Sequence, residues 1–150
     1  MLQIRVFSRL YIKYCFILLV LLSSCGTTGH IIFYQFEANK YDVEKEILNV
    51  INNSSHTLPT KWKDCNKGDY FEMTYVYFKN NPEEIYRLRF KYDSSIWNTS
   101  STSTLALISQ FDGDTWRNDD ELSNKEIQRI QKRFETEILS KIKVPYFKSD

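Results

Sequence analysis

The segment IYRLRFKY, residues 85–92, alternates from Tyr86 onward between large apolar and basic side chains and constrains the fold more than any other stretch. Successive side chains of a strand face opposite ways, so one side of this segment is apolar and the other basic. This pattern is typical of an antiparallel sheet with one face in the core and one face in water. The apolar members are Tyr86, Leu88, Phe90 and Tyr92, and the basic members are Arg87, Arg89 and Lys91.

Three further segments are predicted to belong to the sheet. YFEMTYVYFK, residues 70–79, forms a hairpin with 85–92, because the intervening NNPEE has a turn composition. TLALISQF, residues 104–111, predicts a third strand, which residues 115–117 extend briefly. The apolar run at 31–38 indicates a strand, with the start of a helix left open.

Two amphipathic helices are predicted. Residues 40–52 place Val43, Ile47, Val50 and Ile51 on one face behind an Asn39 N-cap. Ser123 to Glu126, SNKE, form a capping box that begins the second helix, and Pro145 ends it. Its apolar stripe contains Ile127, Ile130, Phe134, Ile138 and Ile142. The residues at 53–69 and 93–103 are expected to be loops.

These elements predict an α+β fold with two layers: an antiparallel sheet of three to four strands with two helices on one face. The order of the elements and the absence of a repeat indicate a single domain over residues 31–145. Residues 146–150 are expected to form a tail.

The N-terminus has the composition of an export signal. An apolar run at 16–22 follows Arg5, Arg9 and Lys13 without any acidic residue, and Ser23 and Ser24 close it. A positive region, a short apolar region and small residues are typical of a secretory signal. The run is far shorter than the roughly 20 residues of a membrane-spanning helix. A buried core element is the alternative, and the charge asymmetry disfavours it.

Leu22-Ser23-Ser24-Cys25 resembles the lipobox of bacterial lipoproteins. The resemblance implies that residues 1–24 are a cleaved signal peptide and that Cys25 carries a diacylglycerol and an acylated N-terminus. Residues 25–30 are then a lipidated tether, which anchors the protein to the membrane of the cell envelope. Gly26 in place of Asp favours the periplasmic face of the outer membrane over the inner membrane, with exposure at the cell surface left open. The remaining chain resembles small lipoproteins of Bacteroides-type bacteria, a likeness that transfers no function.

Net charge excludes one class of partner. The whole chain has 20 basic and 19 acidic residues, and three of the basic residues lie in the predicted signal. The mature chain would therefore carry 17 basic and 19 acidic residues, a net charge of −2. This balance excludes a nucleic-acid-binding protein and gives no general attraction to anionic lipid. The expected partners are the membrane, through the lipid on Cys25, and an envelope protein or glycan.

The long loop at 53–69 holds three candidate contact residues, His56, Trp62 and Cys65. Cys15 would leave with the signal and Cys25 would carry lipid, so Cys65 has no partner for an intramolecular disulfide. It is then a buried small hydrophobe, an intermolecular disulfide or a reactive thiol. His56 and Cys65 could form a thiol–imidazole pair, although no family motif surrounds either residue.

No cofactor or metal is expected. Zinc needs three or four clustered ligands, and the chain has too few soft ones. The acidic stretch from Asp112 to Glu121 fails the spacing of a calcium loop, because its Gly is second and Trp116 stands fifth. These acids are better explained by a turn and a helix N-terminus.

The basic row Arg87, Arg89 and Lys91 is the candidate binding face. Flanked by tyrosines of the neighbouring strand, it suits an anionic or carbohydrate partner, or a protein with an acidic edge. The alternative is an ordinary solvated face whose charge is balanced by Glu72, Glu83 and Glu84.

Three functions follow from these observations. The first is a lipid-anchored envelope protein that serves as a non-catalytic binding or structural domain for an unidentified ligand. The second is a periplasmic inhibitor or immunity protein, and the third is a hydrolase that uses Cys65 and His56.

Overall fold

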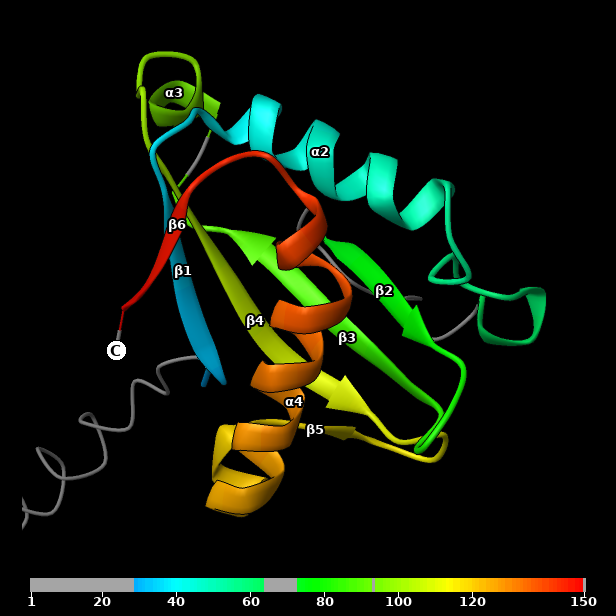
Figure 1. Ribbon diagram of the computed structural model, residues 1–150. Coiled ribbons are helices and arrows are strands. Elements are labelled where there is room, and N and C mark those ends of the chain that lie inside the picture. Colours follow the sequence, from blue (N-terminus) through cyan, green and yellow to red (C-terminus); the bar gives the residue numbers. More distant parts are fainter. Residues whose placement is uncertain (1–28, 64–72, 93, 150) are drawn as a thin grey trace, which may run out of the picture.

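The computed structural model describes residues 29–63, 73–92 and 94–149. Helices α2 and α4 lie on the same face of an antiparallel sheet, so the predicted α+β class and its two layers are confirmed (Figure 1). Within the described ranges, no helix is long and apolar enough to cross a membrane. In chain order, the elements are β1 (Ile32–Phe36), α2 (Lys40–Asn52), η1 (Thr60–Trp62), β2 (Thr74–Phe78), β3 (Glu84–Phe90), α3 (Ser94–Trp97), β4 (Ser103–Phe111), β5 (Trp116–Arg117), η2 (Asp119–Glu121), α4 (Asn124–Glu137), η3 (Leu139–Lys141) and β6 (Tyr146–Ser149).

The sheet is larger than predicted. The described residues form six strands in the order β2-β3-β4-β1-β6, with the short β5 paired to β4, rather than three to four strands. The assignment of residues 146–149 to a tail is corrected, since they pair with β1 as β6. Tyr146 explains this pairing, because its ring packs edge-on against buried Tyr34 with 5.8 Å between the ring centroids. Tyr146 also contacts buried Phe36, with 6.0 Å between the ring centroids, so aromatic contacts with the core hold a strand too short to show a period of its own.

The helix-facing side of the sheet forms the core. Tyr86 and Leu88 are fully buried there, as the alternation predicted, and they belong to one apolar cluster with Val43 of α2 and Phe134 of α4. Tyr92 is the exception, because it lies beyond the end of β3 with φ of 70° and is 61% exposed. The strand therefore ends before the alternation does.

β1 resolves the open choice for residues 31–38. Ile32, Tyr34 and Phe36 are buried on alternate positions, which is a strand pattern. The strand pairs with β4 in antiparallel register, Tyr34 opposite Leu105.

Both predicted helix starts are confirmed. The Asn39 side chain accepts the Asp42 N–H at 3.0 Å, and α2 begins at the next residue. Ser123 accepts the Glu126 N–H through its hydroxyl at 3.4 Å, while the Glu126 carboxylate accepts the Ser123 N–H at 2.9 Å. Each cap satisfies N–H groups that would otherwise have no partner in the first turn.

Two local features were not predicted. The predicted loop at 93–103 contains the short helix α3, and the Trp97 indole donates to the Lys91 carbonyl at 2.7 Å. The predicted stripe of α4 continues beyond the helix, which ends at Glu137 before η3. Ile138 and Ile142 are nevertheless buried. The apolar pattern therefore predicted the core contacts correctly but placed the end of the helix too far along the chain.

Candidate functional site

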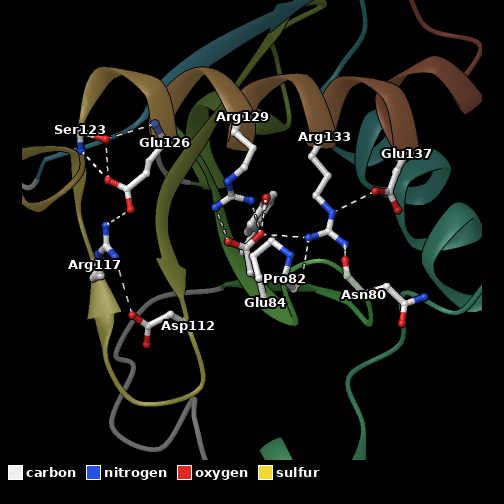
Figure 2. Close-up of polar contacts among 11 residues, drawn as sticks. Asn80, Pro82, Glu84, Asp112, Arg117, Ser123, Glu126, Arg129, Arg133 and Glu137 are labelled. Atoms are coloured by element: carbon white, nitrogen blue, oxygen red, sulfur yellow. Dashed lines mark hydrogen bonds and ion pairs between the residues drawn. The ribbon is translucent and has the colours of Figure 1, made fainter.

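A buried carboxylate joins α4 to the sheet. Glu84 opens β3 on the helix-facing side, and its side chain is 1% exposed. The Arg129 guanidinium donates to both carboxylate oxygens, at 2.8 and 2.5 Å, and Arg133 Nη1 donates to Oε2 at 3.1 Å. The Tyr86 hydroxyl donates to Oε2 at 2.9 Å. We call Glu84, Arg129 and Arg133 the polar seam (Figure 2). The buried charge is tolerated because it is both paired and hydrogen-bonded.

Arg133 also fixes the turn between β2 and β3. Its Nη1 donates to the Pro82 carbonyl at 2.7 Å, and its Nη2 donates to the Asn80 carbonyl. Its Nε donates to Glu137 at 2.9 Å, and the guanidinium lies over the Phe78 ring, 4.6 Å from its centroid. With its side chain 12% exposed, Arg133 is a structural tie between the helix and the turn.

Two hydrogen-bond donors to Glu84, the Arg129 guanidinium and the Tyr86 hydroxyl, have raised pKa values. The hydrogen bond to Glu84 raises the pKa of the Arg129 guanidinium. Burial, together with the nearby Glu84 charge, raises the pKa of the Tyr86 hydroxyl far above its usual range. The tyrosine therefore stays a neutral donor beside the carboxylate.

A concave surface lies beside the polar seam, between α4 and the end of β2. Its volume is about 560 Å³. We call it the basic depression and define it by Lys79, Asn80, Asn81, Arg129, Lys132 and Thr136. Arg133, Glu137 and His56 also contribute to its wall. Four of the residues that line it are basic: Lys79, Arg129, Lys132 and Arg133.

His56, predicted as a loop contact, is a buried structural residue. Its Nδ1 lies 2.9 Å from the Tyr77 carbonyl oxygen, and because a carbonyl only accepts, Nδ1 carries the proton. The His56 carbonyl accepts the Tyr77 N–H at 2.9 Å, and the ring packs on Phe78. These two hydrogen bonds close the outer edge of β2 at Tyr77, which protects an edge strand from unwanted pairing. Nε2 faces Glu137 Oε2 at 3.7 Å.

The other two loop candidates have different outcomes. Cys65 lies outside the described residues, so a thiol–imidazole pair with His56 stays a prediction. Trp62 packs edge-on against Phe111 with ring centroids 5.2 Å apart, and its indole donates to Glu83 at 3.5 Å. Trp62 and His56 thus contact different residues and do not form one site.

Glu83 is held at the surface by several donors. Its carboxylate accepts from Lys61 at 2.6 Å and from the Tyr77 hydroxyl at 2.6 Å. These bonds, that from Lys61 foremost, lower the pKa of Glu83 to about 2. The hydrogen bond that the Tyr77 hydroxyl donates to Glu83 raises the pKa of Tyr77.

The basic row lies on the open face of the sheet, the side opposite the helices. Arg87 and Arg89 are half-buried and Lys91 is exposed. The Arg87 guanidinium lies over the Trp116 ring at 4.0 Å, and Lys91 Nζ lies over the Phe33 ring at 3.7 Å. Tyr75 stands directly opposite Arg87, as the predicted flanking tyrosine.

The expected balance of the basic row by Glu83 and Glu84 is wrong. Glu84 points to the helix side and pairs with Arg129 and Arg133, while Glu83 pairs with Lys61. Glu72 lies outside the described residues. The row's aromatic contacts indicate a packed surface rather than a loose solvated one.

The acidic stretch forms local caps. Asp112 accepts the N–H groups of Asp114 and Thr115 at 3.0 Å each, and the bond from Thr115 is the main cause of its lowered pKa. Glu121 accepts the Asn118 N–H at 2.9 Å at the start of η2. No group of three or more His, Cys, Asp or Glu residues suited to a metal occurs in the described part of the chain.

The sequence analysis missed the polar seam, although one signal was present. Glu84 has the same strand parity as Tyr86 and Leu88, so the period of two places it on the core face. A carboxylate there requires a cationic partner, and Arg129 and Arg133 stand one turn apart on the second helix. Comparison with known proteins adds no relative, since no family model, curated protein or solved structure matches the chain.

Proposed function

We propose that the protein is a lipid-anchored, non-catalytic binding domain of the bacterial cell envelope. The observation that carries the proposal is Cys25, which follows a short apolar segment and a lipobox-like Leu-Ser-Ser just before the folded domain. Two or three acyl chains on this cysteine hold a protein to a bilayer firmly, because each buried methylene contributes about 0.8 kcal/mol. The absence of Asp at position 26 favours the outer membrane.

The short tether supports a position close to the bilayer. The Ile31 N–H donates to the Leu107 carbonyl at 2.8 Å, and the His30 ring stacks on Phe33 at 3.7 Å, so the fold already includes these residues. A side chain at Gly29 would meet the Asp119 carboxylate. Four residue steps separate Cys25 from Gly29, which is at most about 14 Å. The start of β1 and η2 would therefore lie nearest the membrane.

The polar groups of the site support binding rather than catalysis. His56 uses Nδ1 to hold the edge of β2, and the Glu84 carboxylate is occupied by two arginines and a tyrosine. A general base or nucleophile needs a polar atom within reach of a substrate. The basic depression offers hydrogen-bond donors and cations instead, which suits recognition of a ligand.

Substitution of Cys25 tests the anchor. The full-length chain and its Cys25→Ser variant are expressed in a bacterial host, labelled with an alkyne fatty acid and partitioned in Triton X-114. We expect the unsubstituted protein to be labelled and to enter the detergent phase. The variant should lose label and processing together. Cys65→Ser is the matched control and should behave as the unsubstituted chain.

A Cys25→Ser protein that is still cleaved and labelled would overturn the anchor. So would an unsubstituted protein that takes up no fatty acid in a host that lipidates other exported proteins.

A further inference from the structure

We propose that the basic depression binds a phosphate group carried on a larger molecule, that is, a phosphate ester. This inference rests on the proposed function in that it names the ligand class for the binding role. The case depends on five features of the depression: two lysines without an ion-pair partner among the described residues, an excess of positive charge, a pre-organised arginine, neutral polar side chains and a volume that exceeds one phosphate.

Lys79 and Lys132 both line the depression, one after β2 and one on α4. Both are exposed, and neither has an ion-pair partner among the described residues. Three other lysines of the described residues form ion pairs: Lys40 with Glu44, Lys61 with Glu83 and Lys148 with Glu135. The two lysines of the depression are therefore available to an anion.

The depression has an excess of positive charge on an acidic protein. Its cations are Lys79, Arg129, Lys132 and Arg133, and the nearby acids are Glu84 and Glu137. The excess is two positive charges, whereas the chain from Cys25 onward has 17 basic and 19 acidic residues. Such a local reversal of sign attracts an anion to one place on the surface.

Arg129 is pre-organised for an oxyanion. Its pairing with Glu84 uses one N–H on each terminal nitrogen, and each of these nitrogens carries a second N–H. The side chain is 37% exposed, so the guanidinium reaches the depression. A guanidinium already fixed by a carboxylate loses little freedom when it binds a ligand. Arg133 differs, because all three of its nitrogens are bonded to the protein.

Neutral polar groups complete the lining, namely the amides of Asn80 and Asn81 and the hydroxyl of Thr136. A phosphate ester offers several acceptor oxygens and carries about −1.5 to −2 charges at neutral pH, which matches the excess of two. A single carboxylate would leave one of these charges unmatched. The volume of about 560 Å³ falls in the range of small-molecule sites and leaves room for the body that bears the phosphate.

Titration calorimetry on the processed protein in a neutral detergent tests the inference. The probes are inorganic phosphate and glucose 6-phosphate, with glucose as the uncharged control. We expect saturable binding of both phosphates, none of glucose, and weaker binding as salt is raised. A parallel arm measures flotation with phosphatidylcholine vesicles that contain or lack phosphatidic acid. Stronger binding of glucose 6-phosphate points to a soluble ester, and stronger flotation with phosphatidic acid points to a lipid headgroup.

The matched variants are Lys79→Gln/Lys132→Gln and Lys125→Gln/Lys143→Gln. Both pairs are exposed and remove the same net charge, but only the first lies in the depression. The first variant should weaken phosphate binding at least about tenfold and the second less than about twofold. Unchanged thermal midpoints verify that both variants fold.

Two results overturn the inference. One is the lack of saturable binding by the unsubstituted protein to any phosphate-bearing probe, vesicles included. The other is an equal loss in both double variants, which would indicate a general charge effect. Phosphate binding by a protein that proves to be unlipidated would leave this inference standing and remove only the anchor.

Discussion

Helix α4 carries two groups of ion pairs that look alike in sequence and differ in burial (Figure 2). Near its start, Arg117 Nη2 donates to Glu126 at 2.6 Å, and the Glu126 side chain is 38% exposed. About one and two turns on, Arg129 and Arg133 bind Glu84, whose side chain is 1% exposed. The exposed group completes a helix cap, whereas the buried group determines where the helix lies on the sheet.

The difference teaches that the setting of an ion pair decides its role. Exposed pairs contribute little because water screens them. A buried carboxylate has no alternative to its protein partners, so removing one side leaves uncompensated charge. The polar seam therefore holds α4 in place on the sheet, where the helix forms one wall of the basic depression. The cap at Ser123 stabilises only the first turn of the helix.

Glu84→Ala should have the largest effect. It leaves Arg129, Arg133 and the Tyr86 hydroxyl without their shared acceptor, so we expect the free energy of unfolding to fall by about 3–5 kcal/mol. Urea denaturation measures this loss. Glu84→Gln keeps an acceptor oxygen and should lose less. A loss below about 1 kcal/mol for the alanine variant would contradict the importance of the polar seam.

His56→Ala extends the comparison to an uncharged buried group. The variant removes the donor to the Tyr77 carbonyl and the contact with Phe78, and we expect a loss of about 2 kcal/mol in the free energy of unfolding. Lys45→Ala, at an exposed position of α2, is the control and should change it by less than about 0.5 kcal/mol. Equal effects of the two variants would remove the edge-protecting role.

Ser123→Ala tests the exposed cap by itself. Loss of the hydroxyl that accepts the Glu126 N–H should cost about 1 kcal/mol, as N-cap substitutions do. The same denaturation assay serves as the measurement. A cost as large as that of Glu84→Ala would show that burial does not separate the two groups.

Acid titration should give the smallest effect. It shows whether the ionised Glu126, paired with Arg117, stabilises or destabilises the fold. Bonds from the Ser123 hydroxyl, the Ser123 N–H and Arg117 lower the pKa of Glu126 from 4.5 to about 2. A carboxyl whose pKa is lower in the folded state stabilises the fold above the unfolded value, and this contribution is lost as pH falls from 4.5 to 2. Glu126→Gln should flatten the fall of the thermal midpoint over this window. An unchanged dependence of the thermal midpoint on pH would contradict the role of the pair. Some dependence should remain in the variant, because the pKa of Glu83 is also lowered to about 2.

Local signals predicted much of the fold. The alternation of β3 and the capping box of α4 each depend on neighbouring residues, and the structure confirms both. β6 could not be predicted, because it pairs with β1, more than 100 residues away in the chain, through contacts such as that of Tyr146 with Tyr34. The four residues of α3 are likewise too few to show a helical period.

The site was less predictable than the fold. Arg87, Arg89 and Lys91 were correctly placed on the open face, but their contacts with Trp116 and Phe33 depend on distant strands. The basic depression joins residues from three parts of the chain: His56 in the segment after α2, residues 79–81 after β2, and α4. In the sequence, Arg129, Lys132 and Arg133 look like an ordinary solvated helix surface. The one signal of a buried partner is that Glu84 shares the core-facing side of its strand with Tyr86 and Leu88.

The proposed role depends first on Cys25, and the mass of the N-terminal peptide tests it most directly. The protein is purified from membranes and digested, and the peptide that contains Cys25 is measured by mass spectrometry. We predict a peptide that begins at Cys25 and carries a diacylglyceryl group with an added acyl chain on its amine. A peptide that retains residues 1–24, or an unmodified Cys25, would contradict the proposal.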